Sequence, residues 1–542
     1  YGTRNVMYDQ EGYPELNMAG KDGQDLSWNH TSRASAGYFG RINYDYKGIY
    51  LLELNGRYDG SSRFPHTDQW AFFPSASIGY RFSAEAYFAP LKHIVSNGKL
   101  RASFGEIGNE AVGDYMFEQL ISQRLNNKST GYIYWIENNN ANANLLTMYN
   151  MPDLVSSTLT WERIRTLNIG LDLGLLNDEL TIGFDWFQRE NRDMLAPAQV
   201  LPNTLGASAP YENAGTLRTR GWELNLNWRH TFGDFDVYAN FNIGDSKTKV
   251  TKWDNDSKLL STYYTGKTYG DIFGFETDRY FEEKDFTSQN ADGSWNYANG
   301  IASQAGLESG NFHYGPGDVK FKDLDGNGKI DGGKGTADDH GDLKVIGNSM
   351  PRYEYSFHLG GAWKGIDLDL YFQGVGKRED WTTSSLNLPA MVHADVAIYS
   401  HQTSYNKVLW NSDYTAITGY EVNQGNRYPR LYRGTNNSGG TVSGIANGCN
   451  NYYPQSRYLT DMSYLRLKNV TVGYTLPKEW TRKAYIEKAR IYFSGSNLFL
   501  LHKGNDLPVD PEISTGNGLT AGGWGRIAPI TRTFSFGVQV TL

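Results

Sequence analysis

An acidic stretch late in the chain has the residue types and the spacing of a calcium-binding loop. Residues 323–331 read Asp-Leu-Asp-Gly-Asn-Gly-Lys-Ile-Asp, with side-chain oxygens at positions 1, 3, 5 and 9 and glycine at position 6. Calcium loops use such carboxylate and amide oxygens together with the backbone carbonyl of position 7. Position 12 is Lys334 rather than the usual glutamate, so a further carboxylate would have to come from a widened loop.

The sequence therefore predicts a structural site for calcium or a similar hard cation, which would stiffen a long loop. The predicted ligands are Asp323, Asp325, Asn327, Lys329, Asp331, Asp338 and Asp339. The alternative is an Asp/Gly turn that binds no ion. No cofactor is expected to be required for function.

Aromatic side chains in two long polar segments could bind sugars, because flat rings stack on pyranose or furanose faces while Asp, Asn and Arg bond the hydroxyl groups. The candidates lie in segments 109–159 and 251–351 and are Tyr132, Tyr134, Trp135, Tyr263, Tyr264 and Trp295. Packing within a loop, or against a partner protein, is the alternative for each of these residues.

No catalytic constellation is recognisable. The chain has no Gly-x-Ser-x-Gly, His-Glu-x-x-His or phosphate-binding glycine motif, so we predict that it is not an enzyme. A glycosidase carboxylate pair is defined by its separation in space, which a sequence does not show. The net charge of −8 argues against a nucleic-acid partner, which would require a basic face.

The elements that carry these segments are strands with one apolar and one small or polar face. In residues 532–542, Phe534, Phe536, Val538 and Val540 alternate with smaller or polar residues, which is the period of a β-strand. The same pattern recurs to give about thirteen strands. The predicted strands span residues 34–46, 50–59, 70–82, 99–108, 167–175, 180–186, 222–228, 235–243, 355–363, 366–373, 464–476, 489–500 and 531–542.

The connections alternate between tight turns and long loops. Turns at 47–48, 177–178, 233–234 and 364–365 alternate with polar segments of up to about a hundred residues. Outer-membrane barrels have short periplasmic turns and long outer loops, whereas soluble all-β proteins have regularly spaced connections. The sequence therefore predicts an all-β, transmembrane antiparallel β-barrel with long extracellular loops; a propeller or repeat sandwich is the alternative.

An odd number of strands with two bare edges cannot close into a barrel, and unpaired backbone groups in lipid cost several kcal/mol each. We therefore expect residues 1–542 to form the C-terminal part of one larger barrel domain. A slip of the apolar phase between Leu467 and Val470 predicts a β-bulge in the strand 464–476.

Several strings, spread in order over nearly the whole chain, strongly resemble the SusC/RagA family of TonB-dependent outer-membrane transporters. They are RYDGSSRF (57–64), FPS (73–75), KLRASFG (99–105), NAG (213–215), RGWE (220–223), GDVKFKD (317–323), YLRLKNV (464–470), GYTLP (473–477) and GSNLF (495–499). The resemblance implies a barrel of about 22 strands. It also implies that a plug domain, a TonB-binding segment and the first barrel strands lie outside this chain.

The resemblance further implies TonB-dependent import of oligosaccharides from glycan breakdown, across the outer membrane of a Gram-negative, Bacteroidetes-like bacterium. The implied partners are a SusD-like surface lipoprotein that acts as a lid, the TonB–ExbB–ExbD complex, outer-membrane lipid and the glycan cargo, and two transporter–lipoprotein pairs could form a dimer. Import of oligopeptides by the same mechanism is the first alternative. A non-transporting glycan-binding surface protein or adhesin is the alternative from another class.

Overall fold

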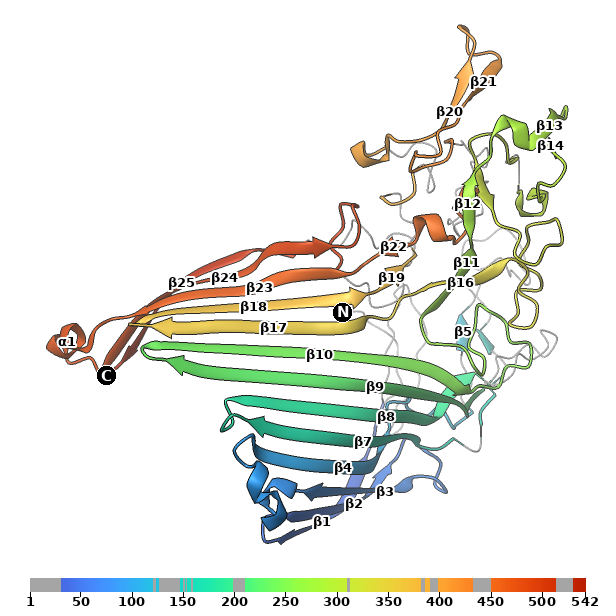
Figure 1. The fold of residues 1–542 in the computed structure, drawn as a ribbon. Coiled ribbons are helices and arrows are strands. Elements are labelled where there is room, and N and C mark those ends of the chain that lie inside the picture. The colour runs from blue at the N-terminus through green and yellow to red at the C-terminus, as the bar shows by residue number, and fades with distance from the viewer. Residues whose placement is uncertain are drawn as a thin grey trace, which may run out of the picture.

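The computed structural model contains one antiparallel sheet of thirteen strands, which confirms the all-β prediction and the expected strand number. The structure describes residues 31–119, 123–125, 147–149, 152, 154–156, 159–197, 210–309, 312–381, 386–389, 398–431, 450–512 and 530–542. The strands follow the order β1-β2-β3-β4-β7-β8-β9-β10-β17-β18-β23-β24-β25, so neighbours in the sheet are also consecutive long strands of the chain (Figure 1).

The bounds of the elements follow the predicted alternation closely. The sheet strands are β1 (Ser35–Tyr46), β2 (Tyr50–Ser61), β3 (Trp70–Tyr80), β4 (Val95–Asn109), β7 (Glu162–Leu175), β8 (Leu180–Pro197), β9 (Tyr211–Phe232), β10 (Phe235–Lys252), β17 (Arg352–Trp363), β18 (Ile366–Lys377), β23 (Tyr464–Thr475), β24 (Lys488–Lys503) and β25 (Thr533–Thr541).

Shorter elements occupy the connections. The short strands are β5 (Gln123–Leu125), β6 (Thr147–Tyr149), β11 (Asp271–Phe275), β12 (Thr277–Tyr280), β13 (Phe286–Gln289), β14 (Trp295–Tyr297), β15 (Val319–Phe321), β16 (Leu343–Asn348), β19 (Glu379–Asp380), β20 (Lys407–Trp410), β21 (Ile417–Glu421) and β22 (Thr460–Asp461). The helical turns are η2 (Phe82–Ala84), η3 (Ala86–Leu91), η6 (Glu283–Asp285), η7 (Ala305–Leu307), η8 (Ser400–Gln402), η9 (Asn450–Tyr452), η10 (Ser456–Tyr458), α1 (Lys478–Thr481) and η11 (Arg482–Ala484). Among the described residues, no helix combines the length and the apolar character that a membrane crossing needs.

The pairing register places apolar residues beside apolar residues on one face of the sheet. Between β7 and β8, for example, Ile169 lies opposite Trp186 and Leu171 lies opposite Phe184. This face is exposed: Ile78 of β3 is 59% accessible and Ile169 of β7 is 49% accessible. An exposed apolar face of this extent is the expected surface of a sheet whose outer side contacts lipid.

Tight turns join the strands at one rim of the sheet. Lys47 and Gly48 have φ values of 58° and 65°, and Lys364 and Gly365 have values of 46° and 89°. Positive φ at both central residues is the conformation of the two-residue hairpin turns that match strand twist. The C-terminus and α1 lie at this rim, while the long connections gather at the opposite rim (Figure 1).

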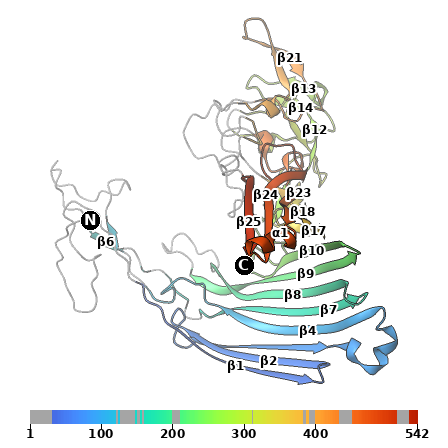
Figure 2. The ribbon, with the colours of Figure 1, turned by 90° about the vertical axis from the view of Figure 1, so that its left-hand side faces the viewer.

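The predicted bulge in β23 is confirmed. Where β23 pairs with β18, Phe372 lies opposite Leu467 and Tyr371 opposite Asn469, so Lys468 is the extra residue; the pairing with β24 also shifts at this point. Seen from the short-turn rim, the sheet is a curved wall with β1 at one end and β25 at the other (Figure 2). Within the described part of the chain, β1 pairs only with β2, and β25 pairs only with β24.

The segments expected to be plain loops contain a packed body, which corrects the interpretation of 251–351 as one long loop. Short strand pairs β11–β16, β12–β15 and β13–β14 lie in this segment. They pack around buried aromatics that include Phe281 and Tyr314, together with Tyr428 and Tyr458 from the following long connection. We call this unit the loop body; it projects beyond the rim opposite the turns (Figure 1).

Candidate functional site

The polar face of the sheet carries paired charges rather than isolated ones. Arg101 of β4 donates from Nε to Asp172 of β7 over 2.8 Å and from an Nη atom to Asp185 of β8 over 2.7 Å. Its guanidinium therefore bridges three strands. Opposite-charge pairs across strands stabilise a sheet, and here they let charged residues line a wall without being unpaired.

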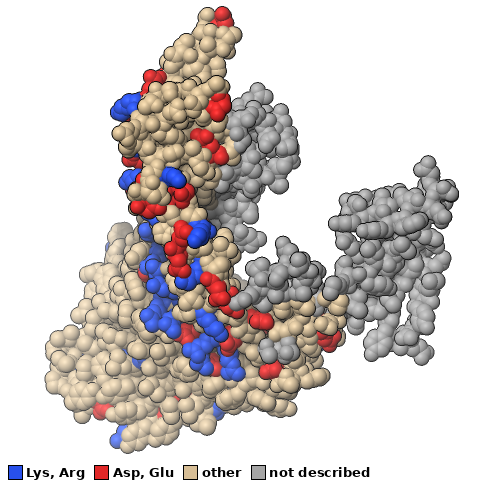
Figure 3. Space-filling model, turned by 90° about the vertical axis from the view of Figure 1, so that its right-hand side faces the viewer, with Lys and Arg blue, Asp and Glu red and all other residues tan. Residues whose placement is uncertain are grey.

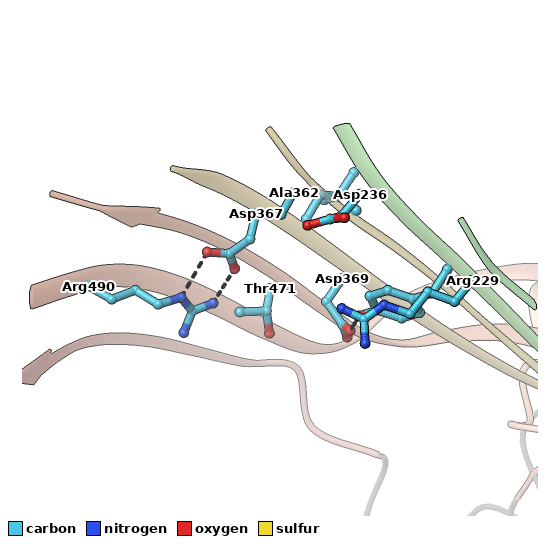
Figure 4. Close-up of a pocket in the computed structure, with 10 residues that line it drawn as sticks. Arg229, Asp236, Ala362, Asp367, Asp369, Thr471 and Arg490 are labelled. Atoms are coloured by element: carbon cyan, nitrogen blue, oxygen red, sulfur yellow. Dashed lines mark hydrogen bonds and ion pairs between the residues drawn. The ribbon is translucent and has the colours of Figure 1, made fainter. Parts of the chain in front are cut away.

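Two further pairs form a polar recess of about 350 Å³ on the same face (Figure 4). Arg490 of β24 donates from Nε to Asp367 of β18 over 2.9 Å, and its Nη atom bonds the second carboxylate oxygen. Asp369 accepts a hydrogen bond from the Tyr238 hydroxyl and lies 2.6 Å from Nε2 of His358.

The remaining lining residues give this recess both signs of charge. Arg229 and Asp236 also line the recess, and Figure 4 shows Thr471 between Arg490 and Asp369. A second recess of about 320 Å³ lies on the wall formed by β9, β10, β17 and β18, and Glu223, Asn225, Tyr371 and Gln373 contribute to it. These donors and acceptors suit a hydrated ligand rich in hydroxyl or amide groups, and nothing in them resembles a cofactor cradle.

The acidic stretch forms a compact turn whose carboxylates converge. Oxygens of Asp323, Asp325 and Asp342 all lie within 4.8 Å of one another. Asp323 accepts hydrogen bonds from the backbone N–H groups of Gly326 (2.7 Å) and Gly328 (2.9 Å), which closes the turn. The remaining lone pairs of the three carboxylates could bind a hard cation such as calcium.

Asp342 is the residue that the sequence did not indicate. It is fully buried and accepts hydrogen bonds from the N–H groups of Leu324 (2.6 Å) and Asp331 (2.9 Å). These bonds bring it beside the loop although it lies well beyond the twelfth position. No spacing rule for calcium loops would have found it, because the chain first passes through several Gly-rich turns.

The other predicted ligands lie around this cluster with different partners. Asn327 and Asp331 close local turns by accepting from the N–H groups of Lys329 (2.8 Å) and Gly333 (2.8 Å). Asp338 pairs with Lys258 at 2.8 Å, and Asp339 lies 3.6 Å from Lys334. Calcium binding stays a prediction.

Of the predicted aromatic residues, Tyr132, Tyr134 and Trp135 lie outside the described residues. Tyr263 stacks on Tyr269 with ring centroids 5.8 Å apart, and burial raises the pKa of its hydroxyl to about 12. The Lys267 amine lies 5.7 Å from the Tyr264 ring centroid and 6.0 Å from that of Tyr263, and burial lowers the pKa of this amine.

Trp295 is placed differently. In β14 it packs against Phe286 with centroids 5.2 Å apart, at the edge of the aromatic core of the loop body. The structure therefore brings Tyr263 and Tyr264 together around Lys267, whereas Trp295 contacts the core. Contact of these aromatics with cargo stays a prediction.

Comparison with known proteins gives consistent matches. The model of the family described as TonB dependent receptor-like, beta-barrel matches residues 1–338. The TonB-dependent receptor P3 of Formosa agariphila is 27% identical over 565 residues, covering 99% of this chain and 48% of that protein. The TonB-dependent receptor SusC of Bacteroides thetaiotaomicron is 25% identical over 498 residues, covering 90% of this chain and 42% of that protein.

Solved structures show the same fold. The RagAB peptide importer in its closed-closed state matches with a TM-score of 0.63 and 19% identity, covering 96% of this chain and 49% of the matched chain. Its open-open state matches with a TM-score of 0.62 and 20% identity, with the same coverage. The chain spans about half the length of the curated relatives it matches.

Proposed function

This chain belongs to the TonB dependent receptor-like β-barrel family, and from that premise we propose that it forms wall strands and outer loops of an oligosaccharide importer. The family consists of outer-membrane transporters and receptors rather than enzymes. One observation carries the proposal: the sheet has a lipid-compatible outer face and a mainly polar inner face with two shallow recesses. Such a wall suits passage of a hydrated cargo.

In this proposal the inner recesses offer transient contacts. Paired groups such as Asp367 and Arg490 can replace one of their hydrogen bonds by a hydrogen bond to a hydroxyl of the cargo, and neither charge is then left without a partner. Weak and multiple contacts favour movement, because a cargo bound too tightly would not leave. Oligosaccharides, with many hydroxyl groups and little charge, match this chemistry.

Import of oligopeptides is the second candidate, and one specific observation favours it. The solved structures with the same fold include a RagAB peptide importer. Peptides carry amide groups and charged termini, which the Arg229, Asp236 and Asp369 side chains of the recess could also bind. The identity of the cargo therefore separates the two candidates.

The proposed partners follow from the same reading. Energy would come from TonB–ExbB–ExbD through parts of the protein beyond this chain, and a SusD-like lipoprotein would close the outer rim. The hairpin β20–β21 suits a contact with such a lid, because Leu409, Trp410 and Tyr414 are exposed large apolar residues at the far end of the loop body (Figure 1). Two transporter–lipoprotein pairs could associate as a dimer.

We also propose that the acidic turn of the loop body holds a calcium ion or a similar cation in a structural role. The convergence of Asp323, Asp325 and Asp342 supports it, because hard cations select oxygen ligands in such clusters. In this role the ion would tie the turn to Asp342 and would take no part in transport.

The test is calorimetric titration of the complete transporter with its lipoprotein against defined oligosaccharides and oligopeptides at matched concentrations. Saturable binding of one glycan class supports the first candidate, and binding of peptides alone replaces it with the second. Uptake of the labelled cargo by cells with and without TonB then tests transport. Uptake that persists without TonB would contradict an energised importer.

A further inference from the structure

The outward face of the central strands changes from apolar to charged along one line. The last outward apolar residues are Phe104 of β4, Leu167 of β7, Trp186 of β8, Trp222 of β9 and Ile243 of β10. Beyond each of them, towards the loop rim, the next outward position is charged or polar. The first such residues are Glu106, Arg165, Gln188, Arg220 and Asp245.

This line follows the plane of a membrane rather than a row of paired residues. Leu167 pairs with Gln188, not with Trp186. The boundary in β8 therefore lies one outward-facing position, or two residues, further from the loop rim than the boundary in β7. It steps again from β9 to β10, where Trp222 pairs with Asp245. Strands tilted by about 35–45° and spaced about 4.8 Å apart require a shift of roughly one residue per strand along a membrane plane.

Basic residues dominate the outward face just beyond this boundary. The basic belt consists of Arg165, Arg192, Arg218, Arg220, Lys247 and Lys249. Three carboxylates lie among these basic residues. Glu106 and Glu190 are buried beneath arginines, and Asp245 is paired with Arg352. The belt is thus positive although the chain as a whole has a net charge of −8.

The register makes this arrangement unfavourable without an anion. Arg220 lies directly opposite Lys247, and Arg218 lies directly opposite Lys249, across the β9–β10 pair. Like charges in directly opposite positions destabilise a sheet. Arg218 is partly neutralised by Glu190 at 2.7 Å, but Arg220 bonds only the neutral Gln188, and among the described residues Lys247 and Lys249 have no ion pair. All three of these last cations are exposed.

The position of the belt identifies the chemistry of the partner. Trp186 and Trp222 pair with each other one outward position below it, and tryptophans mark the membrane interface. Residues two apart on a strand are separated by about 7 Å, so the belt lies at the depth of lipid head groups. Seen from the loop rim, Lys and Arg side chains run as a band over the molecule, with Asp and Glu side chains beside and between them (Figure 3).

We propose that the basic belt binds phosphate groups of anionic lipids in the outer leaflet. Arginine binds phosphate through two parallel hydrogen bonds, and lysine adds a point charge. One phosphate placed between Arg220 and Lys247 would offset their repulsion, and a second could do so between Arg218 and Lys249. The strand ends β4 to β10 would then be anchored at a fixed depth, while the loops above them move.

The test uses the complete transporter in neutral detergent, with diphosphoryl lipid A, monophosphoryl lipid A and phosphatidylglycerol as probes, and counts bound lipid by native mass spectrometry. Replacing Arg220, Lys247 and Lys249 by Gln should weaken binding of the diphosphoryl lipid by roughly 100-fold, because each cation near an anionic surface contributes about a fivefold effect. The monophosphoryl form should lose less.

The matched control removes the same charge at the opposite rim through Lys92→Gln, Lys478→Gln and Lys483→Gln, all exposed residues. Equal losses in both variants, or no loss in the belt variant, would overturn the proposal. The proposal would also be overturned if the belt variant bound lipid normally but no longer bound a second transporter copy or the lipoprotein. The belt would then be a protein interface. If the belt variant fails to fold, raising salt should still release lipid from the unaltered protein, and salt-independent retention would reject the proposal.

Discussion

Asp342 shows that a binding site can depend on a residue that no local pattern reveals. The acidic loop itself was predictable, because Asp323, Asp325 and Asn327 stand at fixed intervals. Asp342 joins them only because its carboxylate caps the N–H groups of Leu324 and Asp331. The spacing of residues in a sequence predicts ligands that lie in the same turn. It does not predict ligands that the folded chain brings in from elsewhere.

We expect calcium to raise the unfolding temperature of the loop body, and Asp342→Asn to reduce that rise. At a calcium concentration one hundred times the dissociation constant, binding would stabilise by about 2.7 kcal/mol. Differential scanning calorimetry with calcium and with a chelator measures the difference, so any direct cost of the substitution cancels. The control is Asp338→Asn. Asp338 pairs with Lys258 outside the cluster, so this variant should show the same rise in unfolding temperature with calcium as the unaltered protein.

Asp380 at the base of the loop body gives a prediction about pH. Burial raises the pKa of this carboxyl to about 6, although Arg378 lies 3.4 Å away and acts in the opposite direction. Because the ordinary value is about 4, folding takes up a proton. The stabilising contribution is therefore present below about pH 4 and is lost as the pH rises through about 6, with a total effect of at most about 3 kcal/mol.

Asp380→Asn should remove this part of the pH dependence. We expect the unfolding temperature of the unaltered protein to fall, relative to the variant, between about pH 4 and pH 7. Scanning calorimetry at several pH values measures it. Asp413→Asn, at an exposed position, should have the same pH dependence of the unfolding temperature as the unaltered protein. Parallel curves for the unaltered protein and Asp380→Asn would show that this carboxyl is not the group that titrates.

At the scale of elements, the sheet and the loop body differ in how far the sequence predicts them. Strands such as β7 and β8 alternate apolar and polar residues over a long span, and the lipid side imposes that period. The strands of the loop body are three to six residues long. Aromatics such as Phe281 and Tyr314 are buried there by contacts between distant segments, which leave no period in the sequence.

The buried ion pair between Asp318 and Arg430 joins distant segments of the loop body. Asp318 is fully buried and accepts hydrogen bonds from Arg430 (2.8 Å), Asn451 (2.8 Å) and the N–H group of Gly315 (2.9 Å). It therefore ties together segments that lie more than a hundred residues apart. Removing one partner of a buried pair leaves an uncompensated charge and typically costs about 3–5 kcal/mol.

Asp318→Ala should consequently loosen the loop body while leaving the wall strands intact. We expect faster proteolysis within residues 251–351 and 398–460, with an unchanged strand signal in circular dichroism. Asp338→Ala is the matched control, because its partner Lys258 forms an exposed surface pair that contributes about 0–1 kcal/mol. If both variants resist protease equally, Asp318 does not hold the segments together.

For the whole molecule, the decisive feature is the pair of sheet edges. In the described part of the chain, β1 and β25 each have one hydrogen-bonded neighbour, and the sheet is a curved wall rather than a closed ring (Figure 2). Backbone groups at an edge inside lipid cost several kcal/mol each when unpaired. We propose that further strands of the same barrel pair with both edges, in keeping with a chain that spans about half of its relatives.

Splitting such a barrel at its edges gives a direct test. Residues 1–542 produced alone in outer-membrane assembly conditions should aggregate or remain protease-sensitive, because the exposed edges of β1 and β25 can pair with other chains. Production together with the rest of a complete transporter should yield a compact, protease-resistant barrel. With the native Cys449 replaced by Ser, one cysteine at Gly40 of β1 and another at Ser535 of β25 would report whether each edge becomes protected. Full protection of both sites in the fragment alone would show that the wall closes on itself.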